Sequence, residues 1–198
     1  MKLQYYEYHN LPIVIIDNYY SETAYNNILK ELNFLQTQLL DPSVEIASYD
    51  NEGKSNKKNK SIFLDDVYKD RSVSHILTEN RKLFSDEMCN ILTEKNIFFR
   101  YCDILDSDST LVSYYEDQDY YKPHFDHATI SALSWFYNEP KGFTGGDLKI
   151  EDSFLVECVK NRIAIFPSIL QHSVTTVTNN KKGMGRFTIS QFACVNLN

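Results

Sequence analysis

The sequence predicts a mainly β fold with helices in its N-terminal part, and three observations favour this class. The 198 residues include 14 Tyr and 12 Phe, and aromatic residues prefer strands. From residue 97 onward, short apolar runs alternate with turn residues, as in a β-sandwich or barrel. Before residue 97, apolar residues recur mainly at helical spacing. The length suits one domain, 1–198, with a full core.

The N-terminal part begins with a predicted strand and continues with two predicted helices. Leu11–Ile16 is a continuous apolar run that predicts the strand. Ser21 is a good helix N-cap, and the apolar positions after it lie three and four residues apart, so a helix is expected up to Asp41-Pro42. A second helix is predicted over roughly 70–95. We therefore expect residues 1–96 to give helical support to the β-core.

Residues 50–61, DNEGKSNKKNKS, have no apolar periodicity and predict a mobile loop. A loop of this length could fold over a substrate as a lid, and it could equally be disordered. Its lysines are explained by a solvated loop at least as well as by a binding patch.

The C-terminal part, 97–198, is predicted to form the β-core and to hold the active site. Eight runs in it predict strands. They are Ile97–Cys102, Thr110–Glu116, Thr129–Tyr137, Asp147–Ile150, Phe154–Val159, Arg162–Phe166, Ser173–Thr178 and Arg186–Val195.

Charge and cysteine content argue against several classes of protein. The net charge of −7 disfavours a nucleic-acid partner, which would require a basic face. The four cysteines form no C-x-x-C pair, and reduced cysteines suit a cytoplasmic protein. The apolar run near the N-terminus is too short for a signal peptide or a membrane span. We expect a cytoplasmic protein without nucleic-acid or membrane partners.

The segment YYKPHFDH places two histidines and an aspartate within four residues. In a strand, His124 and Asp126 would point to the same face and could bind one metal ion. Many strands carry H-x-D by chance, so a third ligand is needed, and His172 is the natural candidate because it follows a predicted buried strand and turn. His127 would face the opposite way and is not expected to bind the metal.

Two histidines and one carboxylate leave three open positions on a metal, an arrangement that suits non-haem Fe(II). In the segment GRFTISQF, Arg186, Thr188 and Ser190 alternate with apolar residues, so one face of this predicted strand is polar. That face could meet solvent or line a pocket. In a pocket, the Arg186 guanidinium would bind a carboxylate through two hydrogen bonds, so that a dicarboxylate could bridge it and the metal.

Over roughly residues 110–195, the sequence resembles the Fe(II)/2-oxoglutarate dioxygenases, specifically their prolyl 4-hydroxylase-like branch. Four segments carry the resemblance in order. They are YYEDQDYYKPHFD, ALSWFYNEPKGFTGGDLKI, NRIAIFPSILQHSVTTV and GRFTISQF. One departure is that collagen-type prolyl hydroxylases use Lys where this sequence has Arg186, which shifts the likeness toward the oxygen-sensing and bacterial members.

The resemblance implies a double-stranded β-helix, also called a jelly-roll, with iron at its mouth. It implies His124, Asp126 and His172 as iron ligands, and Arg186 as the partner of the distal carboxylate of 2-oxoglutarate. The cofactors implied are Fe(II), 2-oxoglutarate and O2, with ascorbate as a further candidate. Additional contacts to 2-oxoglutarate are expected from Tyr115, Leu148, Thr188 or Ser190.

The resemblance also implies hydroxylation of an unactivated C–H with release of succinate and CO2. A prolyl residue in a peptide or protein is the leading candidate substrate. Asp126 favours hydroxylation over halogenation, because related halogenases have a small residue there.

Three alternatives stay open. They are a hydroxylase of a free amino acid or metabolite, a nucleic-acid demethylase and a metal-free β-sandwich binding module. The demethylase is disfavoured because Phe192 stands where that branch has a second arginine.

Overall fold

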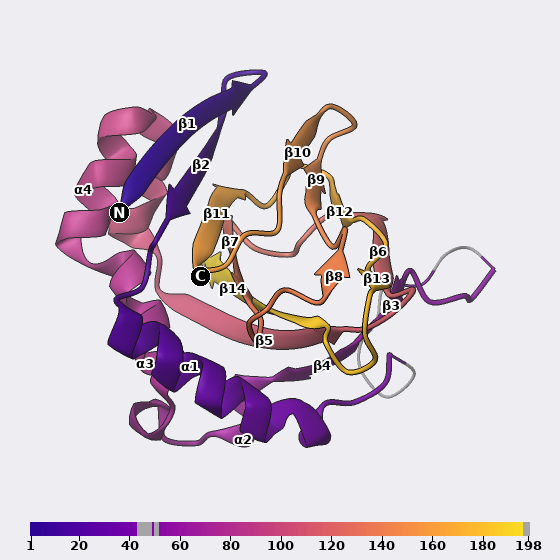
Figure 1. Cartoon of the computed structure of the whole chain (residues 1–198). Helices are drawn as coiled ribbons and strands as arrows, with labels where there is room; N and C mark the ends of the chain where they lie inside the picture. Colours follow the sequence, from indigo (N-terminus) through magenta and orange to yellow (C-terminus); the bar gives the residue numbers. More distant parts are fainter. Residues whose placement is uncertain (43–48, 50–51, 196–198) are drawn as a thin grey trace.

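A computed structural model describes residues 1–42, 49 and 52–195 (Figure 1). Within these residues, two antiparallel β-sheets form the centre of the molecule, and the helices cover the outside of the larger sheet. The larger sheet has the strand order β1-β2-β11-β7-β14-β5-β4. Its strands are β1 (Lys2–Tyr8), β2 (Leu11–Asp17), β11 (Arg162–Pro167), β7 (Ile130–Phe136), β14 (Arg186–Cys194), β5 (Ser107–Tyr115) and β4 (Lys60–Phe63).

The smaller sheet has the strand order β10-β9-β12-β6-β3. Its strands are β10 (Phe154–Val156), β9 (Leu148–Ile150), β12 (His172–Val174), β6 (Tyr120–His124) and β3 (Lys57–Lys58). A separate short pair joins β13 (Thr178–Asn179) to β8 (Phe143–Thr144). β3 and β4 follow each other along the chain but belong to different sheets, so this segment crosses from one sheet to the other.

The helical elements lie mostly between β2 and β5 along the chain. The α-helices are α1 (Glu22–Leu35), α2 (Leu64–Val67), α3 (His75–Asn80) and α4 (Asp86–Lys95), and the 3-10 helices are η1 (Gln36–Gln38), η2 (Arg71–Val73), η3 (Arg81–Phe84) and η4 (Ile97–Ile104). The predicted cap is confirmed, because the Ser21 hydroxyl accepts a hydrogen bond from the Ala24 N–H at 3.2 Å. None of the described helices is long and apolar enough to span a membrane.

Strand β2 shows how the layers are built. Ile13 and Ile15 belong to the core between the two sheets, whereas Val14 and Ile16 pack on the outside with α4 and η4. A strand that is covered on both faces must be apolar at every position, which explains the unbroken run of this segment. The outer core continues under α1, where Ile28 and Leu32 are fully buried.

The structure corrects several of the expected elements. The predicted strand Ile97–Cys102 is the 3-10 helix η4, whose partly or fully buried residues include Phe98, Phe99 and Cys102 and so follow helical spacing. The single helix predicted over 70–95 is broken, because Ser74 and Ser85 each cap a new helix.

The N-terminal part is also less helical than predicted, since β1 to β4 all lie within residues 1–96. The predicted mobile loop 50–61 is wrong for Lys57–Lys58 and for the start of Lys60–Phe63, which pair with β6 and β5. Residues 50 and 51 lie outside the described residues. The other seven predicted C-terminal strands are confirmed as β5, β7, β9, β10, β11, β12 and β14.

Candidate active site

His124 is the last residue of β6, and its imidazole is fixed from two sides. Its Nδ1 lies 2.9 Å from the backbone carbonyl of Lys122, and a carbonyl only accepts, so Nδ1 carries the proton. The Tyr121 ring stacks on the imidazole with centroids 3.6 Å apart and planes 12° apart. The free electron pair of His124 is therefore on Nε2.

His172 opens β12 directly opposite His124, since the two residues are paired in the sheet register. Its side chain is almost completely buried, and its Nδ1 lies 3.0 Å from the backbone carbonyl of Leu170. By the same reasoning, His172 also presents the electron pair of Nε2 to the site.

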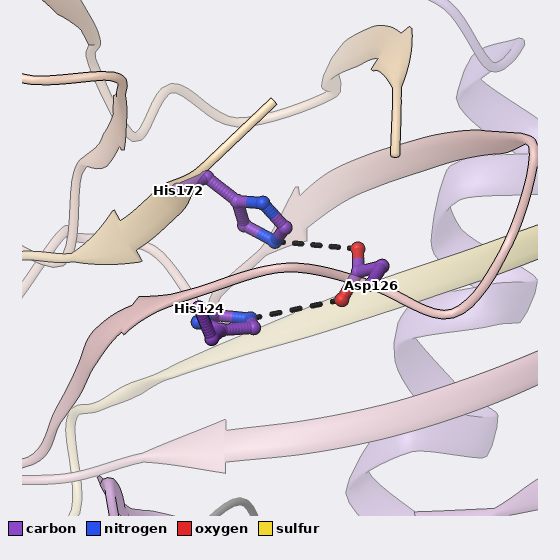
Figure 2. A group of neighbouring side chains, drawn as sticks. All are labelled: His124, Asp126 and His172. Atoms are coloured by element: carbon purple, nitrogen blue, oxygen red, sulfur yellow. Dashed lines mark ion pairs between the residues drawn. The ribbon is translucent and has the colours of Figure 1, made fainter. Parts of the chain in front are cut away.

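Asp126 completes the group, but from a loop and not from the strand face that the sequence predicts. β6 ends at His124, and the chain then turns so that the carboxylate lies between the two imidazoles (Figure 2). Asp126 Oδ2 is 3.2 Å from His172 Nε2, and Oδ1 is 3.7 Å from His124 Nε2. The Ser131 hydroxyl donates to Oδ2 at 2.6 Å and also contacts the Ser168 hydroxyl at 2.7 Å.

The protonation states of this group favour metal binding. Burial, and next the neighbouring His172, lower the pKa of His124 to about 4, so His124 is neutral at neutral pH. Burial acts to raise the pKa of Asp126, but His172 and Ser131 outweigh it, and the net pKa lies below its ordinary value. The site therefore holds a carboxylate beside neutral histidine.

The three side chains fit a divalent cation. Their candidate ligand atoms all lie within 4.8 Å of one another. With each Nδ1 facing a backbone carbonyl, the two Nε2 atoms and the carboxylate converge on one point. A cation bound there would take both Nε2 electron pairs and a carboxylate oxygen, and imidazole with carboxylate is a donor set that suits Fe(II).

Arg186, the first residue of β14, lies in the same cavity and is fully buried. Its Nη1 donates a hydrogen bond to the Thr188 hydroxyl, but its Nε and Nη2 have no partner. These two nitrogens lie on one edge of the guanidinium, which is the edge that binds a carboxylate bidentately. A buried cation with an unpaired edge is costly unless a ligand completes it, so this position fits an anionic carboxylate.

Two neighbours hold the Arg186 side chain in place. The guanidinium carbon lies 4.1 Å from the centroid of the Tyr115 ring, and Tyr115 pairs directly with Arg186 across β5 and β14. Gly146 passes close on another side, where a Cβ would lie 2.6 Å from Arg186 Nε. Burial raises the pKa of Tyr115 to about 12, so its hydroxyl stays neutral.

One cavity of about 740 Å³ contains all of these groups. Leu148 and Ser190, both expected to contact a cosubstrate, line it with Thr188. Exposed His127 also lines it, but His127 is not one of the three clustered residues.

The sequence analysis missed several cavity residues. Lys57 and Asn59 were assigned to a mobile loop, yet both are buried in the wall. No local signal in this lysine-rich segment could have found them, because the pairing of β3 with β6 and of β4 with β5 places the segment. The stacking of Tyr121 on His124 became visible only in three dimensions.

Residues 110–194 match the family model described as the 2OG-Fe(II) oxygenase superfamily. A comparison with curated proteins gave no match. The matched segment runs from within β5 to the end of β14, so it includes the three clustered residues and Arg186.

Solved structures share the fold at low sequence identity. A Pseudomonas putida prolyl-4-hydroxylase has a TM-score of 0.63 at 13% identity, covering 93% of this chain and 92% of that one. A Trichoplax adhaerens prolyl hydroxylase, in complex with a peptide fragment of the hypoxia inducible factor oxygen degradation domain, has a TM-score of 0.58 at 12% identity, covering 92% and 83%. A Burkholderia pseudomallei oxidoreductase of the 2OG-Fe(II) oxygenase family has a TM-score of 0.57 at 14% identity, covering 93% and 85%.

These structures confirm the predicted jelly-roll fold with its large antiparallel sheets. Residues 110–194 thus match the 2OG-Fe(II) oxygenase family model, and the chain shares its fold with solved prolyl hydroxylases.

Proposed function

We propose that this protein is a Fe(II)- and 2-oxoglutarate-dependent dioxygenase that hydroxylates an unactivated C–H, with a prolyl residue of a peptide or protein as its leading substrate. One observation carries the proposal. A two-histidine, one-carboxylate cluster and a buried guanidinium with an unpaired edge, on Arg186, line the same cavity.

Under this proposal, His124, Asp126 and His172 hold Fe(II). The iron, when bound, supplies the activation of O2 that couples decarboxylation of 2-oxoglutarate to hydroxylation, giving succinate and CO2. The protein keeps the side chains that would bind the iron in the protonation states that metal binding requires. The carbonyls of Lys122 and Leu170 fix both imidazole tautomers, and burial keeps His124 neutral.

Arg186 would bind the distal carboxylate of 2-oxoglutarate through Nε and Nη2. Thr188 accepts from the third nitrogen and so orients the guanidinium, while Tyr115 supports its face. Leu148 would pack on the carbon chain, and the Ser190 hydroxyl lines the same wall.

Two features support a prolyl substrate. Two of the solved structures that share the fold are described as prolyl hydroxylases, and one of them holds a peptide. The cavity lining also includes apolar side chains that are exposed, among them Phe125 and Tyr49, at 55% and 49%. An aromatic mouth of this kind suits a proline ring on an extended peptide.

A second candidate function is hydroxylation of a free amino acid or other small acid. The observation that favours it is a second polar region in the cavity, at Lys57 and Asn59.

The test is single-turnover oxidation. Protein is loaded anaerobically with Fe(II) and 2-oxoglutarate and then mixed with O2 and a panel of proline peptides and free amino acids, with and without ascorbate. We expect succinate together with the gain of one oxygen atom by one member of the panel. His172→Ala and Arg186→Met should abolish both, while His127→Ala should retain iron and activity. Absence of succinate in every arm would contradict the proposal.

A further inference from the structure

Two buried serine hydroxyls lie behind the carboxylate of Asp126. Ser131 is the second residue of β7, Ser168 lies in the turn after β11, and both are fully buried. The Ser131 hydroxyl is 2.6 Å from Asp126 Oδ2 and 2.7 Å from the Ser168 hydroxyl. Buried hydroxyls are almost always hydrogen-bonded, and here both bond toward the same carboxylate.

The direction of these hydrogen bonds follows from the carboxylate. An ionised carboxylate only accepts, so Ser131 gives its single hydroxyl proton to Asp126. The Ser131 oxygen must then accept from Ser168, which makes Ser168 the donor of the serine pair. The result is a chain that runs from Ser168 through Ser131 to Oδ2, and hydrogen bonds aligned in this way strengthen one another.

The turn that carries Ser168 also supports one of the histidines. The Leu170 N–H donates to the Pro167 carbonyl at 3.0 Å, which closes the turn. The Ser168 N–H donates to the Thr129 carbonyl at 3.2 Å, so the turn is held against the residue that precedes β7. The Leu170 carbonyl in turn faces Nδ1 of His172. One turn therefore orients this histidine directly and, through its serine, the carboxylate as well.

The hydroxyl of Ser131 distinguishes the two oxygens of Asp126. Oδ2 lies 3.2 Å from His172 Nε2 and Oδ1 lies 3.7 Å from His124 Nε2, so these distances alone would allow a metal to bind both oxygens (Figure 2). The hydrogen bond from Ser131 draws on the electron density of Oδ2 only. Oδ1 is therefore the oxygen better prepared to bind a cation.

We propose that Ser131 and Ser168 are positioning residues that hold Asp126 for metal coordination through Oδ1 alone. This inference rests on the proposed function and deepens it. Coordination through both oxygens would fill one more position on the metal. Two histidines and a one-oxygen carboxylate leave three positions open, and 2-oxoglutarate and O2 together need all three. The serine pair thereby keeps one of these positions free.

The experiment compares two serines of the same strand. Ser131→Ala removes the hydroxyl that contacts Asp126. Ser134→Ala is the matched control, because Ser134 also lies on β7 and is 1% exposed, but its hydroxyl lies 3.4 Å from the Tyr20 hydroxyl in the outer core. Ser168→Ala keeps the Ser131 hydroxyl and removes its donor. Urea unfolding of each variant measures what the substitution does to stability.

Metal binding is measured by calorimetry, with Mn(II) and with Co(II). Ser131→Ala should bind Mn(II) about tenfold or more weakly, because a group that orients a metal ligand is lost. Ser168→Ala should lose less, and Ser134→Ala should match the unchanged protein. N-Oxalylglycine, an inert analogue of 2-oxoglutarate, should still bind metal-saturated Ser131→Ala, since Arg186 is untouched.

The visible absorption spectrum of bound Co(II) reports the number and arrangement of its ligand atoms, which a general loss of stability would not change. We expect this spectrum to differ between Ser131→Ala and the unchanged protein, and to be the same in Ser134→Ala and the unchanged protein. An unchanged Co(II) spectrum in Ser131→Ala would overturn the inference even if Mn(II) binds more weakly, and it would leave the proposed function standing.

An equal loss of Mn(II) affinity in Ser134→Ala would also overturn the inference, because the effect would then belong to strand β7 as a whole. Failure of the unchanged protein to bind either Mn(II) or Co(II) is a different result. It would contradict the proposed function, and the role of the serine pair with it.

Discussion

The guanidinium of Arg186 depends on a glycine that leaves room for it. Gly146 has φ +71°, and a Cβ there would lie 2.6 Å from Arg186 Nε and 3.0 Å from Val177. We expect Gly146→Ala to displace the guanidinium and weaken binding of N-oxalylglycine to Mn(II)-loaded protein by about tenfold or more, because a bidentate charged contact is lost. Calorimetric titration measures the change.

A matched control separates the loss of ligand affinity from the effect of backbone strain. Gly53 has φ +75°, and a Cβ there would meet nothing within 4 Å. Both alanine variants should lose about 1 kcal/mol of unfolding free energy from the left-handed backbone, but only Gly146→Ala should lose ligand affinity. Normal affinity in Gly146→Ala would show that Arg186 does not need this space.

Local pattern explains which site residues could be predicted from the sequence. His124 and Asp126 are two residues apart, and Arg186 starts a strand with an alternating polar face, so short-range spacing and family resemblance sufficed. Lys57 and Asn59 were missed because nothing local distinguishes a cavity lysine from a solvated one. Their burial depends on pairing with β6, which lies more than 60 residues away along the chain.

At the level of elements, an ion pair joins β2 to β11 within the larger sheet. Arg162 Nε lies 2.6 Å from Asp17 Oδ1, and Nη2 lies 3.1 Å from Oδ2. The bond from Arg162, the largest of several causes, lowers the pKa of Asp17 below its ordinary 3.8. Asp17 is thus easier to ionise in the folded state, and its contribution to stability is present above pH 3.8 and lost as the pH falls through the lowered value.

We expect Arg162→Met to lose about 1 kcal/mol of unfolding free energy at pH 7, because the pair is bidentate and partly buried. The difference from the unchanged protein should shrink as the pH falls below about 4, when Asp17 becomes protonated. Urea unfolding at several pH values measures this difference in unfolding free energy.

The control is Lys149→Met, which breaks an exposed pair with Asp152 and should lose almost no unfolding free energy. A loss in Arg162→Met that is the same at every pH would assign its effect to packing.

Elements with a strong local pattern were predicted well, and those defined by distant contacts were not. The C-terminal strands carry regular apolar runs, and seven of the eight were found. β1 is an edge strand without buried residues, so its sequence shows little pattern, and only pairing with β2 defines it. Segment 97–104 has strand-forming residues, but the burial of Phe99 against the outer core imposes a helical turn.

At the level of the whole molecule, the site connects the two sheets. His124 and His172 belong to the smaller sheet, whereas Asp126 is tied by Ser131 to β7 of the larger sheet, and Arg186 starts β14 of that sheet. A metal with a bound dicarboxylate would bridge both sheets. Because the unfolded chain does not hold these groups together, binding must stabilise the folded state.

This coupling predicts a large thermal shift. At 100 times the dissociation constant, Mn(II) should add about 2.7 kcal/mol of stability, which corresponds to a rise in Tm of about 5–10 °C for a chain of this length. N-Oxalylglycine should raise Tm further, and only when metal is present. His172→Ala should remove the metal shift, and Arg186→Met should remove only the second increase. His127→Ala should keep both. A metal-free binding module would show no shift with Mn(II) in any variant, so this single series separates the oxygenase from the remaining non-catalytic alternative.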